Sequence, residues 1–356
     1  MNVPAIVHRH PALRWLAPIA VVGIAGLAAT GTFDRAAASR QLPATSPAAL
    51  IAAVQAPKVT GFSGTLVSRL SLGLPELPAI GNAGNGASLT SLLSGSHTLQ
   101  FWYRGADKQR VALLGATDET DLFRSGRQVW QWSSADDVAL HGVMPMAETS
   151  AAPTSVRPSP IDSLTPSGMA TSVLAMLDPT TEMEIRNNRR VADRDAYELV
   201  LTPRTPATRV GSVHIAVDGR TKVPLGVQVY ARGQSSAAVD VSFSTIRFAP
   251  PSDAYFRFHP PADAKVHDVD VDVDVDRYLP SALFGKTWST VYTYRIGHPV
   301  AFRDHELGEA SQTVSGTWGT GRLLTSDLFS VLVTNDGRVY TGAVDPDALY
   351  LAAGSK

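Results

Sequence analysis

Apolar and polar residues alternate with a period of two in three neighbouring stretches of the chain, between residues 213 and 243. Side chains two apart in a strand lie on the same face, so each stretch presents one apolar face to a core. The apolar positions are Val213, Ile215 and Val217, then Leu225, Val227 and Val229, then Val239, Val241 and Phe243. Asp218-Gly219, between the first two stretches, predicts a tight hairpin. The pattern therefore predicts an antiparallel sheet made of consecutive hairpins.

Further strands and two short helices are predicted before this sheet. Residues 58–72 form one predicted strand, and residues 97–132 form a meander. Ser46 and Thr165, each followed by proline, are typical N-caps of helices with an apolar stripe. The second stripe consists of Met169, Val173 and Leu177. Short amphipathic helices among many strands can bury their stripes only against a sheet. We therefore expect an α+β fold: a curved antiparallel half-barrel with helices filling its open side, plus a small β-rich C-terminal module.

Two segments without periodicity interrupt this pattern. Residues 73–96 are rich in Gly, Pro, Ser, Asn and Leu and predict a loop. Its leucines either cover the mouth of a cavity or pack as an irregular insertion. Residues 136–166 gain Ala, Ser, Thr and Pro, and predict a long connection.

The first 45 residues predict a targeting segment followed by a linker. Arg9 and Arg14 precede residues 15–33, which carry no charge, and Ala36-Ala37-Ala38 offers a small-residue cleavage motif. The uncharged run is also close to the roughly 20 residues that span a bilayer. A retained anchor in the cytoplasmic membrane is therefore the alternative to a cleaved signal peptide. Both interpretations place the rest of the chain in the cell envelope or outside the cell, membrane-anchored or secreted.

Two segments follow the predicted half-barrel, which we assign to residues 46–266. Residues 267–285 contain alternating Asp and Val, so that all the Asp side chains share one side of an extended chain. Calcium repeats need glycine turns that this segment lacks, which favours a solvated connector or a charge-guarded edge strand over a metal site. Residues 286–356 form a predicted C-terminal β-hairpin module, with a turn signal at Thr334-Asn335-Asp336-Gly337.

Composition and motifs exclude several classes of chemistry. The 31 Lys and Arg residues balance 32 Asp and Glu, which gives no electrostatic argument for nucleic-acid binding. A chain without cysteine has no disulfide, thiol nucleophile or Cys–zinc site. Nucleotide-binding, hydrolase and metalloprotease motifs do not occur, so we predict no cofactor, no metal and no catalytic residue. A hydrolase stays as a distant third hypothesis, based on His298, Asp304, His305 and Glu306.

The order of these elements resembles the LolA and RseB (MucB) group of bacterial envelope proteins. The resemblance covers residues 46–266, and its residues lie in five places. They are Asp193-Arg194-Asp195-Ala196-Tyr197 before Leu199-Val200-Leu201-x-Pro203, Pro224-Leu225 after an acidic turn, Phe256-x-Phe258-x-Pro260-Pro261, Gly105-x-Asp107-Lys108-x-Arg110-Val111, and Gly126-x-x-Val129-Trp130-x-Trp132. The loop 73–96 and the tail after residue 266 depart from the group, and the tail is similar to that of actinobacterial LolA-like proteins of unknown function.

The resemblance implies an incomplete antiparallel barrel whose apolar cavity takes acyl chains. The expected wall consists of Phe101, Leu113, Trp130, Trp132, Ile215, Val227 and Phe243, and the helix with Met169, Val173 and Leu177 is the expected lid. From the sequence alone, Trp130 and Trp132 are equally well explained as core residues. Arg110 corresponds to an Arg that ties the lid shut in carrier members of the family; the alternative is a solvated Arg at the end of a strand.

Two functions from different classes follow from this comparison. The first is an exported carrier or chaperone that binds lipid or lipoprotein acyl chains. The alternative is an RseB-like sensor that holds a membrane anti-sigma regulator, which the additional C-terminal module favours.

Overall fold

The computed structural model describes residues 42–56, 59–74, 92, 95–144, 164–269, 282–284, 287–295 and 311–355. The predicted targeting segment 15–33, most of the Asp/Val segment 267–285 and the group of His298, Asp304, His305 and Glu306 lie outside these residues. Within them, no helix combines the length and the apolar character needed to cross a bilayer.

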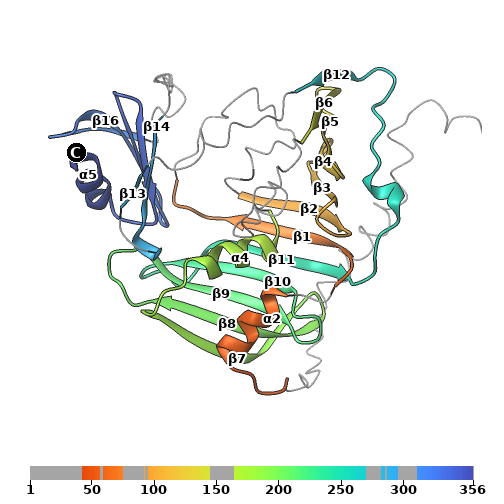
Figure 1. Ribbon diagram of the computed structural model, residues 1–356, viewed down its shortest axis with the longest axis horizontal. Helices are drawn as coiled ribbons and strands as arrows, with labels where there is room; N and C mark the ends of the chain where they lie inside the picture. Colours follow the sequence, from red (N-terminus) through yellow and green to blue (C-terminus); the bar gives the residue numbers. More distant parts are fainter. Residues whose placement is uncertain are drawn as a thin grey trace, which may run out of the picture. The chain divides into compact units, whose positions relative to one another are not determined.

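A twelve-stranded sheet forms the larger part of the fold (Figure 1). Its strand order is β12-β6-β5-β4-β3-β2-β1-β11-β10-β9-β8-β7, and its two edges do not pair with each other. The strands are β1 (Phe62–Leu70), β2 (Gly95–Tyr103), β3 (Lys108–Leu114), β4 (Glu119–Ser125), β5 (Gln128–Ser133), β6 (Val138–Val143), β7 (Thr181–Val191), β8 (Arg194–Pro203), β9 (Val210–Asp218), β10 (Pro224–Ala231), β11 (Ala237–Arg247) and β12 (Lys265–Asp268). The predicted α+β class with an open, curved antiparallel sheet is confirmed.

The sheet consists of two meanders that a single strand pair joins. Strands β2 to β6 follow one another in space as in sequence, and so do β7 to β11. Strand β1 pairs with β2 on one side and with β11 on the other. The β1–β11 register shifts between Thr65 and Leu66, and such a bulge bends the bulged strand and increases its twist.

Turn chemistry sets the register, and one turn differs from the prediction. Ala192 and Asp193 both have positive φ in the tight β7–β8 turn, the geometry of primed hairpins. The β9–β10 turn is wider than the hairpin expected at Asp218-Gly219, because the Asp218 amide donates to the Val223 carbonyl at 2.9 Å. The Asp218 carboxylate is 1% exposed and accepts hydrogen bonds from Arg194 and from the Thr221 amide. This buried carboxylate organises residues 218–223 into a wide turn.

Two short helices, α2 (Pro47–Gln55) and α4 (Pro166–Ala175), pack on one face of the large sheet. The predicted N-caps are confirmed. The Ser46 hydroxyl accepts from the Ala49 amide at 3.2 Å, and the Thr165 hydroxyl accepts from the Gly168 amide at 3.0 Å. Both helices have proline in the first turn, where no amide partner is lost.

A second sheet has six strands in the order β13-β14-β18-β17-β16-β15, with helix α5 packed on it. Its elements are β13 (Ala282–Phe284), β14 (Val291–Arg295), β15 (Ser311–Gly316), β16 (Gly319–Thr325), β17 (Ser330–Thr334), β18 (Arg338–Gly342) and α5 (Pro346–Gly354). The hairpin predicted at Asp336-Gly337 joins β17 to β18, with Gly337 at φ 82°. Two short 3-10 turns, η3 (Asp253–Phe256) and η5 (Thr287–Ser289), complete the described elements named here.

Strands β6 and β12 lie where the sequence analysis placed connections. β6 falls inside the segment 136–166, and its alternation is hard to recognise because its two buried residues, Ala139 and Gly142, are small and lie on opposite faces of the strand. β12 overlaps the start of the Asp/Val segment and pairs in parallel with β6. All its side chains are exposed, which agrees with the guarded edge strand that was one of the two predicted alternatives.

Candidate functional site

The face of the large sheet that carries the helices is continuously apolar from β8 to β3. Register pairs place the rows on one side: Leu199 opposite Ile215, Ile215 opposite Val227, Val227 opposite Val241, Phe243 opposite Leu66, Leu66 opposite Leu99, and Leu99 opposite Leu113. Period-two alternation puts these residues in line across the strands. We call this side the helix-facing side and the other the outer face.

Five of the seven predicted wall residues lie together on the helix-facing side. They are Phe101, Leu113, Ile215, Val227 and Phe243, none more than 3% exposed. Ile215 and Val227 belong to the apolar cluster beneath α2 and α4. The other three belong to a neighbouring cluster formed mainly by β1, β2, β3 and β11, to which β7, β8, β9 and β10 each contribute one residue. The expected wall is therefore one surface with two adjoining apolar clusters.

Helix α4 lies over the junction of these two clusters. Met169 packs against both clusters, and Val173 and Leu177 pack against the first. Met169 and Val173 on α4 are only partly buried, as is Leu177, which the sequence placed on the helix but which lies just after its end at Ala175. Ala170 and Leu174 on the helix are buried. A methionine side chain is flexible and adapts to irregular gaps, so Met169 suits a position where two apolar surfaces meet.

Trp130 and Trp132 lie on the outer face and do not line this surface. Arg110 is opposite Phe123, and Phe123 is opposite Trp130, so these residues share a face that Val111 and Leu113 do not. Trp132 packs with Phe123 and Ala139. The ring of Phe258 lies over the rings of Phe123, Trp130 and Trp132, at centroid distances of 4.8 to 5.9 Å. Beneath the segment that follows β11, Trp132 is a core residue, as the alternative interpretation of the sequence has it, whereas Trp130 packs against this core and stays partly exposed.

Arg110 is also on the outer face, and its partner is Asp121. Its Nε and Nη2 donate to the two carboxylate oxygens of Asp121 at 2.9 and 3.1 Å. The guanidinium carbon is 4.7 Å from the ring centroids of both Trp102 and Phe123. This placement corrects the expectation that Arg110 holds a helical lid, because the helices cover the other side of the sheet.

A shallow pocket opens on the outer face beside these aromatic residues. Its volume is about 200 Å³. It is lined by Phe123, Ser125, Gln128, Trp130, Phe256, Arg257, Phe258 and His259. Phe123 and Phe256 are almost fully buried, so the pocket offers a ligand little apolar area. It is far smaller than a site for a long acyl chain requires.

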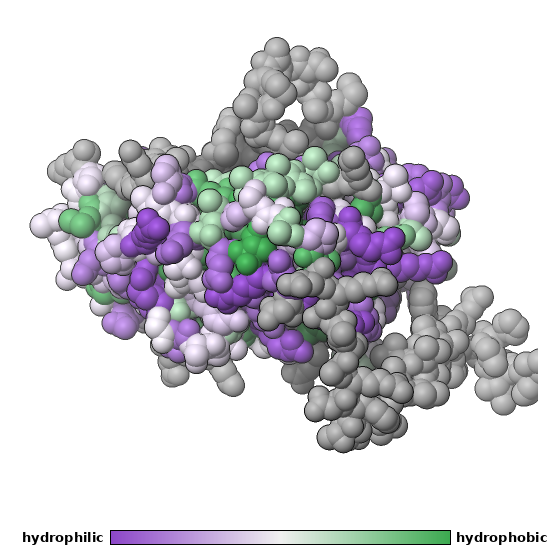
Figure 2. All heavy atoms as spheres, turned by 90° about the horizontal axis from the view of Figure 1, so that it is seen from below, coloured by the Kyte–Doolittle hydropathy of each residue, from purple (hydrophilic) through white to green (hydrophobic). Residues whose placement is uncertain are grey.

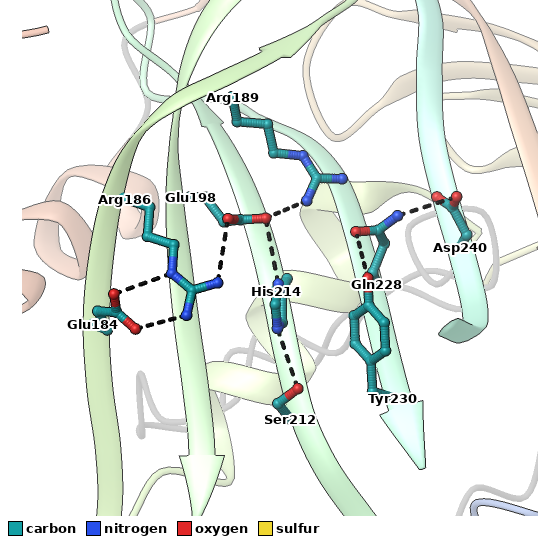
Figure 3. Close-up of polar contacts among 9 residues, drawn as sticks. All are labelled: Glu184, Arg186, Arg189, Glu198, Ser212, His214, Gln228, Tyr230 and Asp240. Atoms are coloured by element: carbon teal, nitrogen blue, oxygen red, sulfur yellow. Dashed lines mark hydrogen bonds and ion pairs between the residues drawn. The ribbon is translucent and has the colours of Figure 1, made fainter. Parts of the chain in front are cut away.

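The outer face of β7 to β11 carries a strip of polar side chains (Figure 3). We call it the outer polar strip; its residues are Glu184, Arg186, Arg189, Glu198, Ser212, His214, Gln228, Tyr230 and Asp240. Glu198 is its centre, and it contacts Arg189 and, at 3.3 Å, His214 Nδ1. Burial alone would raise the pKa of Glu198, but the hydrogen bond and charge of Arg189 hold that pKa below its usual range.

Part of this strip has the order of a catalytic triad. Ser212 Oγ is 3.1 Å from His214 Nε2, and His214 Nδ1 is 3.3 Å from Glu198. In a hydrolase the carboxylate is reserved for the histidine, which it orients and stabilises as a cation. Here Arg189 and Arg186 both contact Glu198, so this carboxylate is not reserved for His214. We assign these residues to cross-strand stabilisation of β7, β8 and β9.

The surface seen from the side of β7 and α2 is mixed, with hydrophilic residues around a smaller apolar group (Figure 2). Edge strand β7 contributes Glu182, Glu184 and Arg186, all exposed at the rim of the sheet. Met183 on the same strand is 42% exposed. Charged side chains on an edge strand oppose pairing with another chain, so this rim is guarded.

Comparison with known proteins gives similarity at the level of structure. No family model matches the chain, and no curated protein matches it. A solved structure of MucB is similar over 86% of this chain and 95% of its own, with 16% identity and a TM-score of 0.44. The complex of Pseudomonas aeruginosa MucA and MucB is similar over 85% and 94%, with 16% identity and a TM-score of 0.40. A LolA superfamily protein from Nitrosomonas europaea is similar over 60% and 99%, with 11% identity and a TM-score of 0.23.

Both groups named by the sequence resemblance therefore occur among the structurally similar proteins. The identities to these structures are 16% or less and the TM-scores are below 0.5. The function of this chain is therefore inferred from the arrangement of its own residues.

Proposed function

We propose that this chain is an exported protein that binds lipid or lipoprotein acyl chains against the helix-facing side of its large sheet. The observation that carries the proposal is the continuous apolar surface from β8 to β3 beneath two short helices. An acyl chain could enter this surface where its cover consists of separate, partly exposed apolar side chains. Met169, Val173 and Leu177 form such a cover over the junction of the two clusters.

Helix α4 is suited to move when a ligand enters. It has 10 residues, below the length at which isolated helices are stable in water, so packing and caps hold it in place. An acyl chain gains about 0.8 kcal/mol for each CH₂ group it buries, so about ten buried groups contribute roughly 8 kcal/mol before ordering costs. An acyl chain that enters between α4 and the sheet would replace the apolar contacts of the helix with its own.

Ligand binding is tested with protein purified from the cells that export it. We expect native mass spectrometry to show bound lipid, and a dansyl-labelled undecanoic acid to bind with enhanced fluorescence. Val173→Asn should weaken probe binding several-fold, because it places an amide on the apolar side of α4. Ala175→Asn is the matched control, since Ala175 is exposed on the same helix. Absence of both co-purified lipid and probe binding would refute the proposal.

A second candidate is a sensor that binds a membrane regulator protein. The observation in its favour is the additional six-stranded sheet, which an acyl-chain carrier does not need. Crosslinking in cells, followed by identification of the captured proteins, separates the two. Capture of a transmembrane regulator supports the sensor, whereas capture of lipoproteins alone supports the carrier.

Export is inferred from the sequence of residues 1–45, and it can be tested directly. The mass of the protein recovered from the cell envelope shows whether the segment 15–33 was removed as a signal peptide or kept as a membrane anchor. Recovery only from the cytoplasm would contradict export.

A further inference from the structure

The C-terminal sheet reaches the end of helix α4 through the turn η5. Thr287 and Trp288 of this turn precede β14. Trp288 is 2% exposed and belongs to the apolar cluster that includes Leu174 of α4. Trp288, from the turn that leads into strand β14 of the second sheet, is thus part of the core beneath the proposed lid.

Five side chains join the two parts in one hydrogen-bond network. Trp288 Nε1 donates to Thr181 Oγ1 at 2.8 Å, and Thr181 Oγ1 donates to the Asp178 carboxylate at 3.1 Å. The Thr287 hydroxyl donates to the other oxygen of Asp178. Thr180 adds its amide at 2.9 Å and its hydroxyl at 2.7 Å. Asp178 and Thr180 lie between α4 and β7, and Thr181 begins β7.

Two features show that this network is under local constraint. Asp178 lies just after the C-terminus of α4, where the helix dipole disfavours a negative charge unless donors compensate it. The hydrogen bond from Thr287, followed by that from Thr180, lowers the pKa of Asp178 to about 2. Thr287 also has φ 54°, a conformation that costs free energy for a β-branched residue.

The C-terminal sheet has other attachments, which do not involve α4. The amide of Arg209 and the hydroxyl of Thr208 donate to the Ala343 carbonyl, both at 2.8 Å. The Asp327 amide donates to the Leu72 carbonyl at 2.8 Å. These contacts tie the second sheet to the residues that follow β1 and to the segment before β9, independently of η5.

We propose that Thr287 and Trp288 act as a latch on helix α4, so that lifting α4 and releasing η5 are a single event. The latch rests on the proposed function in one respect: the ligand that lifts α4 is an acyl chain. The latch would couple an occupied lipid site to the C-terminal sheet. Any ligand that favours the displaced position of α4 also favours the release of η5.

Hydrogen exchange of the α4 amides tests the latch without any ligand. Thr287→Val removes the donor to Asp178 at nearly constant volume, and Trp288→Phe removes the donor to Thr181 while keeping a ring. Each should speed exchange of the α4 amides by roughly tenfold or more, with exchange in β8 and β9 unchanged. Thr287→Ser keeps the hydroxyl and should restore slow exchange. Trp318→Phe is the control, because Trp318 stacks on Tyr350 of α5.

Probe binding then tests the coupling. Dansyl-labelled undecanoic acid should bind Thr287→Val more tightly than wild type, by a factor close to the gain in α4 exchange, because less free energy opposes lid opening. Unchanged α4 exchange in both Thr287→Val and Trp288→Phe would overturn the latch. Faster exchange with unchanged probe affinity would overturn the coupling. A wild-type protein that binds no probe would refute the proposed function, while the exchange result would still decide the latch.

Discussion

Replacing Arg110 tests the assignment of this residue to the outer face. Asp121 is 1% exposed, and its carboxylate receives two hydrogen bonds from Arg110. Arg110→Met keeps the aliphatic stem against Trp102 and Phe123 but leaves the carboxylate without its cation. Breaking a buried pair by removing one partner costs about 3–5 kcal/mol, because an uncompensated charge stays inside. For a protein of this size the melting temperature should fall by about 6–20 °C.

The pH dependence of this variant has a defined sign. Burial raises the pKa of Asp121, against the lowering effect of Arg110, so the folded pKa exceeds the unfolded value even in the wild type. Loss of Arg110 raises that pKa further. A carboxyl with a raised folded pKa destabilises the protein as pH increases through that pKa. The stability difference between Arg110→Met and wild type should therefore be largest near neutral pH and shrink as pH falls through the raised folded pKa of Asp121.

Urea unfolding of wild type, Arg110→Met, Asp121→Asn and the double variant forms a double-mutant cycle. Asp121→Asn in the Arg110→Met background should recover stability at neutral pH, because no charge is left buried. Arg69→Met is the matched control, since Arg69 is 59% exposed and its pair with Asp240 should contribute less than about 1 kcal/mol. Equal stability of Arg110→Met and wild type, or a double variant no better than Arg110→Met, would refute the reasoning. Probe dissociation should be unchanged in Arg110→Met.

Three further outcomes follow from residues described above. Leu174→Ala removes a side chain that is 7% exposed between α4 and the sheet, and it should cost about 2–5 kcal/mol in urea unfolding. Thr165→Ala removes the N-cap of α4, and it should cost about 1 kcal/mol and speed hydrogen exchange in the first turn of the helix. Glu198 has a lowered folded pKa, so its contribution is present above about pH 4.3 and is lost as pH falls through the folded value. The acid-dependent loss of stability should therefore be smaller in Glu198→Gln than in wild type, and equal pH profiles would contradict the role of Glu198.

The alternation of apolar residues was sufficient to predict the sheet and most of the apolar surface. Val213, Ile215 and Val217 lie on one buried face of β9, as their period of two predicted. Helix starts were equally clear, because Ser46 and Thr165 combine a capping hydroxyl with a following proline.

The sequence does not show which face of each strand meets the helices. For this reason Trp130 and Arg110 were predicted on the wrong face of the sheet. Period two divides a strand into two faces but does not say which of them meets the helices. The two-residue turn at Gly126-Arg127 does carry information, because it pairs Phe123 with Trp130 and thereby Trp130 with the face of Arg110. Counting through that turn would have separated the tryptophans from Leu113.

Contacts between distant segments had no local signal. Thr287 and Asp178 are 109 residues apart, and each has an ordinary local pattern. Glu198 likewise lies in a largely apolar stretch of β8, and its place at the centre of the outer polar strip depends on three strands being in register. Such sites emerge only once the strand order is known.

The joining of two meanders by β1 and β11 has a consequence for folding. Within each meander, strands pair with their neighbours in sequence, and hairpins of this kind form within microseconds. The β1–β11 pair joins Ser63 to Arg247, so it closes a loop that contains nearly the whole large sheet. Loop-closure entropy makes such pairing late and slow. We therefore expect two transient half-sheets that collapse independently, with the docking of β1 onto β11 as the slow step that creates the helix-facing side in one piece.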